Sequence, residues 1–331
     1  MANKKFAGIL GAASACAAVS YAMGSFAFHQ VIERDSTLFS KIAGKVTEKQ
    51  QDESAQSKFS PVAAESEEWF ANQTVEDVTM INDRGQTLKG YYFPAEKKSN
   101  VFVFCSHGYR SSGKGEYGKF TKFYHDMGIN IFLVDHQSAG ESEGKYIGFA
   151  YYEYQDGLKW LNYLTDRFGD DIQIFLHGIS MGSATVMMMT GDIRLPKNVK
   201  FTIADCGYTT AWEEFAHNLD SWHVPKEPTL GIASMISRRK AGYGFKEADA
   251  ISRVKQARVP MLFIHGGSDT FVPTRMGYEL YDACNASYKD LLIVDGAEHA
   301  ESYKVNPEPY EEKVREFMDK FIKTPAKVSK K

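Results

Sequence analysis

The chain has 331 residues, 43% of them hydrophobic, and a formal net charge of −3 at neutral pH. This length is sufficient for one large buried core, and the small net charge argues against a nucleic-acid-binding protein. The four cysteines form no CxxC pair, so the sequence predicts neither a zinc site nor a dithiol redox centre.

Residues 1–28 predict a membrane-targeting segment. Lys4 and Lys5 precede an uncharged run over residues 6–28. As a helix rising about 1.5 Å per residue, this run is long enough to cross a hydrocarbon layer of about 30 Å. The positive charge before it predicts that the N-terminus stays inside and the rest of the chain is exported. We expect a single-pass membrane anchor, with a cleaved signal peptide and a secreted protein as the alternative.

The next segment, residues 29–72, is polar and mixed in charge, and we expect a tether that ends in a short helix opening at Pro61. Residues 75–94 then alternate between apolar and polar side chains, with turn-forming residues at positions 82–85. This pattern predicts a β-hairpin at the start of the main domain.

After the hairpin, strand and helix patterns alternate along the chain. The expected strands are 101–108, 130–137, 171–176, 200–207, 260–267 and 290–299, and the expected helices are 115–127, 151–168, 183–189, 274–283 and 309–322. Such alternation predicts an α/β fold, with a mostly parallel central sheet and helices on both faces. The predicted domain covers residues 73–323, and a basic tail, residues 324–331, follows it.

One segment, residues 209–258, interrupts the alternation. It separates two strands by about fifty residues, well above the usual loop length, and its pattern is helical and rich in aromatic side chains. An apolar insertion at the carboxyl edge of a parallel sheet predicts a cap over a crevice, with Trp212 and Phe215 as candidate substrate contacts. The alternative is a peripheral elaboration with its own small core.

A serine lies between two glycines at the point where a strand pattern turns into a helix pattern. Ser180 is flanked by Gly178 and Gly182 in the stretch HGISMGSAT. The arrangement G-x-S-x-G between strand and helix is typical of a nucleophile elbow, a tight turn that exposes the serine hydroxyl. Side chains two residues before and after the serine would collide, which explains the glycines. The helix that follows directs backbone N–H groups toward the reacting oxygen.

A serine nucleophile needs a base and an acid that orients the base, and on this fold they follow in the order Ser, Asp, His. Asp269 in HGGSDTFVP and His299 in DGAEHAES each follow a predicted strand. Both therefore belong at the carboxyl edge of the sheet, beside Ser180. Asp205, which ends another predicted strand, is the alternative acid.

The reaction also needs donors for the oxyanion that forms on the substrate. The backbone N–H groups of Met181, directly after the nucleophile, and of Tyr109, in the turn after the first predicted parallel strand, are the candidates. His107 and Arg110, in the same turn, are candidate substrate-binding residues.

With these motifs the chain resembles the α/β-hydrolase superfamily, and within it the membrane-anchored or exported bacterial hydrolases loosely grouped as serine aminopeptidase-like and acyl-esterase-like. The resemblance covers residues 75–322 and rests on SHGYRSSG, DHQSAGESEG, HGISMGSAT, HGGSDTFVP and GAEH. The second motif departs from the common pattern D-x-R-G-x-G-x-S, because Gln137 and Ser138 replace Arg and Gly. The resemblance implies hydrolysis of an ester, thioester or amide through an acyl-enzyme, with no cofactor and no metal.

The leading hypothesis is a serine hydrolase that cleaves the carboxylic ester of a small-molecule or acyl substrate. A serine peptidase, amidase or lipase at the cell surface would use the same residues. A hypothesis of another class is a catalytically silent, membrane-tethered binding protein, but the complete serine, aspartate and histidine set argues against it. The sequence leaves open the substrate and the oligomeric state.

Overall fold

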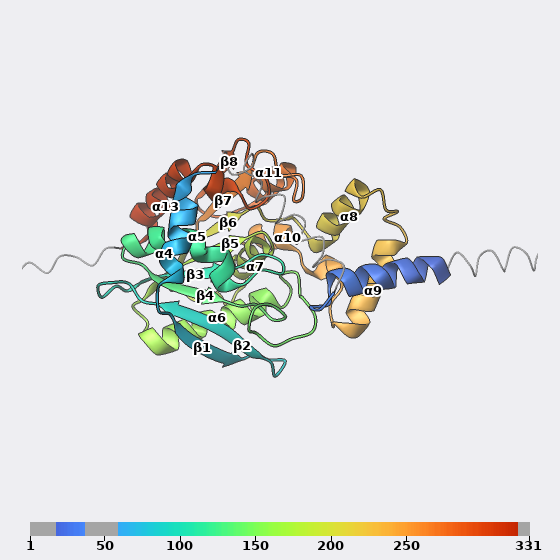
Figure 1. Cartoon of the computed structure of the whole chain (residues 1–331), viewed down its shortest axis with the longest axis horizontal. Coiled ribbons are helices and arrows are strands. Elements are labelled where there is room, and N and C mark those ends of the chain that lie inside the picture. The colour runs from blue at the N-terminus through green and yellow to red at the C-terminus, as the bar shows by residue number, and fades with distance from the viewer. Residues whose placement is uncertain (1–17, 37–58, 324–331) are drawn as a thin grey trace, which may run out of the picture.

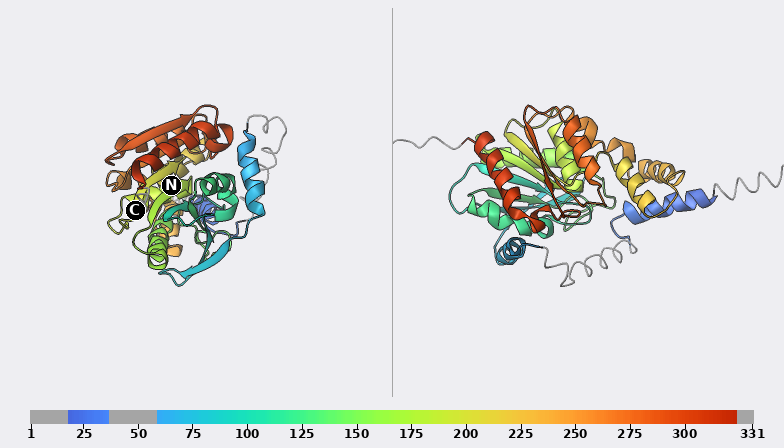
Figure 2. Two further views of the ribbon diagram at one scale, coloured as in Figure 1. Left: turned by 90° about the vertical axis from the view of Figure 1, so that its left-hand side faces the viewer. Right: turned by 90° about the horizontal axis from the view of Figure 1, so that it is seen from above.

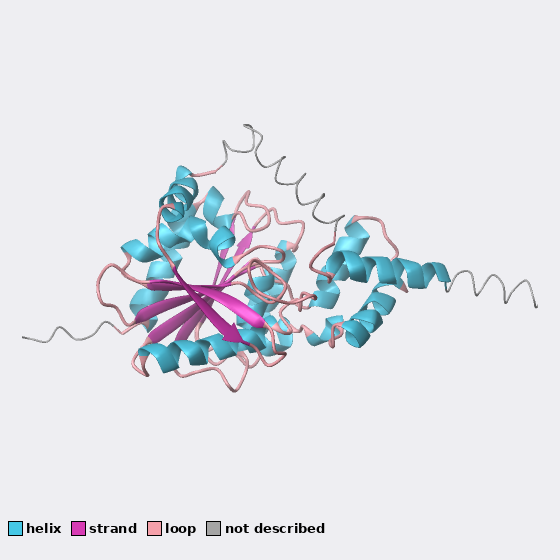
Figure 3. Ribbon diagram, turned by 60° about the horizontal axis from the view of Figure 1, so that its bottom comes forward, coloured by secondary structure: helices cyan, strands magenta, loops and turns pink. Residues whose placement is uncertain are grey.

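The structure, a computed structural model, describes residues 18–36 and 59–323 (Figure 1). A twisted sheet runs through the larger part of the molecule with helices on both of its faces (Figure 3). A smaller group of helices lies at one end (Figure 1). The predicted α/β class and layered architecture are therefore confirmed.

Eight strands form the sheet in the spatial order β1-β2-β4-β3-β5-β6-β7-β8. Strands β3 to β8 are parallel, whereas β2 is antiparallel to both β1 and β4. The predicted hairpin is the β1–β2 pair. The strand bounds are β1 Glu76–Ile81, β2 Thr87–Phe93, β3 Val101–Ser106, β4 Asn130–Val134, β5 Gln173–Ile179, β6 Val199–Asp205, β7 Met261–Gly266 and β8 Lys289–Val294.

The helices divide between the two faces of the sheet and the smaller end group. Their bounds are α4 Pro61–Ala71, α5 Gly113–Asp126, α6 Glu153–Phe168, α7 Met181–Thr190, α8 Ala211–Ser221, α9 Thr229–Lys240, α10 Ala250–Val254, α11 Thr274–Ala283, α12 Ser302–Val305 and α13 Pro307–Phe321, with a 3₁₀ turn, η1, at Phe245–Glu247. Helices α4, α5 and α13 cover one face, and α6, α7, α10 and α11 pack in the core on the other.

Strand β3 shows why the central strands are unbroken apolar runs in the sequence. Phe102 and Phe104 point into the core that contains α6 and α7, and Val103 and Cys105 point into the core that contains α5 and α13. All four side chains are buried. Because both faces of a parallel sheet are covered, both sets of alternate side chains must be apolar.

The predicted cap contains α8, α9, η1 and α10. A helix over residues 18–31 lies along the cap, as Figure 2 shows in blue beside the yellow and orange helices. Phe28 and Ile32 are fully buried in the same core as the cap residues Leu230 and Phe245.

This helix crosses the domain boundary that the sequence analysis predicts after residue 28. Residues 18–36 pack on the cap through an apolar face at positions 27, 28, 31 and 32. Positions 31 and 32 fall in the predicted polar tether, whose mixed charge did not indicate this packing. Residues 37–58 of the tether and the basic tail, residues 324–331, lie outside the described residues.

Across residues 18–36 and 59–323, no helix has both the length and the apolar character needed to cross a membrane. Residues 1–17, which hold about half of the predicted membrane span, lie outside the described residues. The membrane anchor and the exported location stay predictions.

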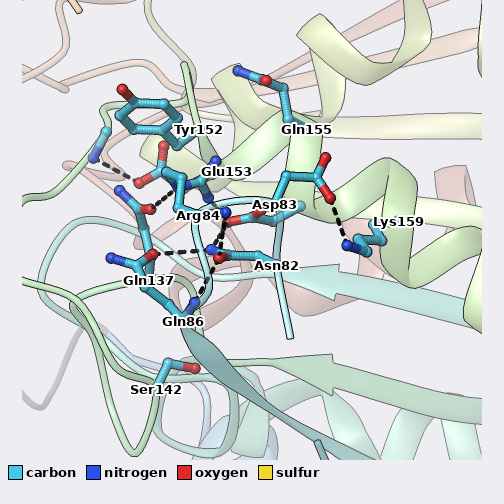
Figure 4. A network of polar contacts seen from close by, with 12 residues as sticks. Asn82, Asp83, Arg84, Gln86, Gln137, Ser142, Tyr152, Glu153, Gln155 and Lys159 are labelled. Carbon is cyan, nitrogen blue, oxygen red and sulfur yellow. Dashed lines mark hydrogen bonds and ion pairs between the residues drawn. The ribbon is translucent and has the colours of Figure 1, made fainter. Parts of the chain in front are cut away.

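The loop after β4 contains the two residues that depart from the common family pattern, Gln137 and Ser138. Arg84, in the turn of the β1–β2 hairpin, donates from Nε to the side-chain oxygen of Gln137 at 2.9 Å and forms an ion pair with Asp156 (Figure 4). Its guanidinium also lies 4.2 Å from the ring centre of Tyr152. The Arg84 guanidinium therefore contacts Gln137, the residue that replaces the arginine of the family pattern. Through its ion pair with Asp156 it also connects the loop after β4 to α6.

Candidate active site

Ser180 occupies a strained turn between β5 and α7. Its φ of 56° and ψ of −117° lie in a region that side-chain-bearing residues rarely adopt. A Cβ atom at Gly178 would overlap the carbonyl oxygen of Gly182, and one at Gly182 would overlap the carbonyl oxygen of Ser106. Steric exclusion on both sides of the serine therefore requires the two glycines, and the turn has the geometry of the predicted elbow.

Three candidate catalytic side chains form a continuous hydrogen-bonded chain. The Oγ atom of Ser180 lies 2.8 Å from Nε2 of His299, and Nδ1 of His299 lies 2.8 Å from Oδ2 of Asp269. Asp269 follows β7 and His299 follows β8. Parallel strands bring residues from three distant parts of the sequence to one edge of the sheet.

Asp269 is held in its charged form. Its Oδ1 atom accepts the backbone N–H groups of Phe271 and Val272 at 3.0 and 2.9 Å. Burial by itself would raise the pKa of Asp269, but hydrogen bonds from His265 and His299 lower the pKa to about 2. The carboxylate is therefore ionised at neutral pH and suited to stabilise a positively charged imidazole on His299.

The alternative acid, Asp205, has a different environment. Its Oδ2 atom accepts a hydrogen bond from the Tyr310 hydroxyl at 3.1 Å, and burial raises its pKa to about 6. The structure places Asp269, not Asp205, against the ring of His299.

The two candidate oxyanion donors flank the serine. Met181 is the first residue of α7, where backbone N–H groups have no partner within the helix. The turn that carries Tyr109 passes close to the nucleophile, because a Cβ atom at Gly108 would lie 3.3 Å from Cβ of Ser180. The two backbone segments thus approach Ser180 from α7 and from the turn after β3.

His107 does not line the pocket next to Ser180, contrary to the prediction that it binds substrate. It is fully buried; its Nδ1 atom lies 2.7 Å from the Gly108 carbonyl oxygen, and its Nε2 atom accepts the backbone N–H of His136 at 3.0 Å. Burial lowers its pKa. His107 therefore joins the loop after β3 to the loop after β4.

Arg110 is also absent from the pocket lining, so its predicted contact with substrate is not observed. Its guanidinium donates to the backbone oxygens of Gln30, Glu33 and Arg34 and to the Ser36 hydroxyl, at 2.7 to 3.1 Å. These oxygens lie at the carboxyl end of the helix over residues 18–31, where carbonyl groups need donors. Arg110 therefore fastens this helix to the turn beside Ser180.

A pocket of about 740 Å³, including its open mouth, adjoins Ser180 and Met181. Most of its walls are apolar, and they come from α8, α9, the turn after β7 and the helix over residues 18–31. Phe215 lines it as predicted and packs edge-on against Phe149 and Phe245. Trp212 does not line it, because its ring faces Lys246, whose Nζ lies 4.4 Å from the ring centre.

Sequence patterns did not single out several residues that line this pocket. Ala27 and Val31 lie one helical turn apart, but Ala27 lies at the end of the predicted membrane segment and Val31 lies in the predicted tether, so the sequence analysis did not connect them. Tyr208, Glu214 and Thr229 are polar residues of the cap region with no motif to mark them.

Within residues 18–36 and 59–323, no three histidine, cysteine, aspartate or glutamate side chains gather as metal ligands would. The ionisable groups at the site include those of the serine, histidine and aspartate chain, the carboxyl group of Glu214 and the phenols of Tyr109 and Tyr208. The arrangement can activate a hydroxyl nucleophile and stabilise an oxyanion beside an apolar pocket.

The sheet topology and the elbow define the chain as a member of the α/β-hydrolase superfamily. Residues 146–325 match the prolyl oligopeptidase family. The uncharacterized protein YqkD of Bacillus subtilis is 30% identical over 236 residues, with 71% of this chain and 76% of that protein covered. This chain therefore belongs to the prolyl oligopeptidase family and is a serine hydrolase.

More distant proteins share the fold. Mouse monoglyceride lipase is 23% identical over 251 residues, with 66% of this chain and 82% of the lipase covered. The structure of the Pyrococcus furiosus esterase Pf2001 matches with a TM-score of 0.61 at 22% identity, covering 76% of this chain and 92% of the esterase. A solved structure from Bacteroides ovatus, described as a putative dipeptidyl aminopeptidase IV, matches with a TM-score of 0.56 at 16% identity, covering 75% of this chain and 36% of that one.

Proposed function

We propose that the protein hydrolyses carboxylic esters through an acyl-enzyme, with Ser180 as nucleophile, His299 as base and acid, and Asp269 as the orienting carboxylate. The observation that carries this proposal is the chain of 2.8 Å contacts from Ser180 to His299 to Asp269 at the wall of an apolar pocket. The names of the lipase and esterase relatives support the choice of an ester.

In this mechanism, Ser180 Oγ attacks the ester carbonyl while His299 Nε2 takes its proton. Asp269 stabilises the resulting imidazolium, and the N–H groups of Met181 and Tyr109 stabilise the oxyanion. The tetrahedral intermediate then expels the alcohol, which receives the proton from His299. A water molecule, activated by His299, releases the acid and restores Ser180.

The pocket favours an ester with an apolar acyl group. Its lining includes Phe149, Phe215, Leu219 and Leu230, and the part of the lining that the structure describes contains no lysine or arginine. Burying an acyl chain there removes apolar surface from water, which supplies binding energy. A peptidase or amidase remains the second candidate, because the family is named for peptide cleavage.

The first test compares the purified full chain with three variants on p-nitrophenyl esters of increasing acyl length and on aminoacyl p-nitroanilides. Ser180→Ala should lower kcat for esters by about 10⁶-fold, and Asp269→Asn by about 10⁴-fold, as in other enzymes of this type. Asp205→Asn is the matched control for a buried carboxylate at a strand end and should retain most of the activity.

Anilide turnover that exceeds ester turnover would replace the esterase proposal with a peptidase. Loss of activity in Asp205→Asn with retention in Asp269→Asn would reverse the assignment of the acid. Absence of both turnover and labelling of Ser180 by a fluorophosphonate probe would favour the catalytically silent binding protein.

A further inference from the structure

The apolar pocket beside Ser180 contains three polar side chains that the ester mechanism does not use. Tyr208 follows β6, Glu214 belongs to α8 and Thr229 opens α9, and all three line the pocket. Each side chain is at most 4% exposed. Three separate segments of the chain thus place polar groups in one otherwise apolar space.

The three side chains share a second property. Within the described part of the chain, the hydroxyl oxygens of Tyr208 and Thr229 and the Oε2 atom of Glu214 have no hydrogen-bond partner. Buried polar atoms nearly always have partners, because burial without one is unfavourable. Three such atoms belong to side chains that line one pocket, so a bound molecule can supply the missing hydrogen bonds once the pocket wall shifts to expose these shielded atoms.

The carboxyl group of Glu214 is fixed in place and uncharged. Its Oε1 atom accepts a hydrogen bond from the side-chain amide of Asn218 at 2.6 Å, which leaves Oε2 available. Burial raises the pKa of Glu214 to about 8, so the carboxyl group holds its proton at neutral pH and can donate it in a hydrogen bond.

We propose that Tyr208, Glu214 and Thr229 form a polar subsite that hydrogen-bonds the hydroxyl groups of an otherwise apolar ester substrate. This inference rests on the proposed esterase function and names its substrate class. Hydroxyl groups both donate and accept, which matches a set of two hydroxyls and a protonated carboxyl.

Charged substrate groups fit this subsite poorly. Among the described residues, the lining contains no lysine, arginine or histidine that would pair with a carboxylate or phosphate on the substrate. Glu214 is its one carboxyl group and is neutral, so it offers no counter-ion to an ammonium group. An uncharged hydroxyl group on the substrate needs neither a cationic nor an anionic partner.

The hydroxyl groups have two chemical sources, the alcohol part of the ester or its acyl chain. One pair of substrates compares the glycerol monoester of a fatty acid with the methyl ester of the same acid. A second pair compares the methyl ester of a hydroxylated fatty acid with that of the unsubstituted acid. The subsite predicts a higher kcat/KM for the hydroxylated member of one pair, and that pair identifies the source.

Isosteric variants test the assignment in the full chain. Tyr208→Phe and Thr229→Val remove only the hydroxyl groups, and each should lower kcat/KM on the preferred hydroxylated ester by about tenfold, the effect of one lost hydrogen bond. Their activity on the plain ester should fall clearly less than their activity on the hydroxylated ester. Ser237→Ala is the matched control, because Ser237 is buried in α9 but does not line the pocket, and it should change neither value.

Glu214→Gln distinguishes a neutral subsite from an anionic one, because glutamine keeps a donor and an acceptor without a charge. The preference for the hydroxylated ester should persist in this variant. A wild-type preference for amino-substituted esters that Glu214→Gln abolishes would overturn the hydroxyl subsite and favour an ammonium site.

Equal losses on hydroxylated and plain esters in Tyr208→Phe and Thr229→Val would also overturn the subsite, because they would show a purely structural role. Wild-type hydrolysis of plain and hydroxylated esters at equal rates would reject the subsite and leave the esterase function standing. Absence of any ester hydrolysis would instead reject the esterase function itself.

Discussion

At the scale of single residues, the surroundings of each buried carboxyl group decide its charge. Asp269 is paired with His299 and two backbone N–H groups, and its pKa falls to about 2. Asp205 lacks these donors, and burial raises its pKa to about 6. Both aspartates lie at or just after the ends of buried strands, so their residue type and position in the sequence did not show which one contacts His299. The hydrogen-bond donors around each aspartate do show it.

Glu153 provides a pH-dependent prediction at this scale. It is fully buried, and one carboxyl oxygen accepts the Gly148 N–H at 2.7 Å. Burial raises its pKa in the folded protein from 4.5 to about 7. The folded state therefore holds the proton more tightly than the unfolded state, so its contribution to stability is full below pH 4.5 and is lost as pH rises through 7.

The loss should approach about 3 kcal/mol at pH 8, if the whole pKa difference acts on folding. Urea unfolding at pH 5 and pH 8 measures it. Glu153→Gln cannot ionise and should show a smaller fall in the free energy of unfolding between these pH values than the wild type. Glu65→Gln, on the exposed face of α4, should retain the wild-type fall. Identical pH slopes in the wild type and Glu153→Gln would contradict the prediction.

At the scale of elements, two side chains from the turn beside Ser180 hold the carboxyl end of the helix over residues 18–31. Arg110 donates to the carbonyl group of Gln30 in the helix and to those of Glu33 and Arg34 just after it. The Tyr109 hydroxyl donates to the Val31 carbonyl at 2.6 Å. The same turn carries the candidate oxyanion donor. These hydrogen bonds therefore connect the end of the helix to the turn that positions the Tyr109 N–H.

Arg110→Ala should loosen this helix without unfolding the sheet. Hydrogen bonds from charged donors contribute about 1.5 to 3 kcal/mol each, so their loss should speed amide exchange in residues 18–36 by tenfold or more. Hydrogen–deuterium exchange with mass spectrometry measures this by segment, and β5 should be unaffected. Arg275→Ala, which removes an exposed pair with Glu279, is the control. Unchanged exchange in residues 18–36 would show that Arg110 does not hold the helix.

At the scale of the whole molecule, the candidate substrate pocket lies between parts that are far apart in the sequence. Ala27 and Val31 near the N-terminus face α8 and α9 of the cap, and Ser180 at the edge of the sheet completes the pocket. Figures 1 and 2 both show this helix beside the cap. The helix over residues 18–31 therefore contributes part of the wall of the candidate substrate pocket.

Ala27→Trp should shorten the acyl chain that the pocket accepts. The larger side chain fills space that long acyl groups need, so kcat/KM should fall about tenfold for dodecanoyl esters and little for acetyl esters. A series of p-nitrophenyl esters measures the profile. Val19→Trp changes the same helix at a position that is 60% exposed and should leave the profile unchanged. A uniform decrease at all chain lengths in Ala27→Trp would indicate damage to the fold instead.

The sequence by itself determined the features that depend on neighbouring residues. Strand and helix periodicity predicted the α/β sheet, and G-x-S-x-G predicted the elbow at Ser180, because sterics within a few residues require both glycines. Tertiary structure decided the features that depend on contacts between distant segments. It placed Asp269 rather than Asp205 at His299, turned Arg110 toward the helix over residues 18–31, and gathered polar side chains from three segments into one pocket. Such contacts have no local pattern, because they arise only when the sheet brings separate strand ends and the cap together.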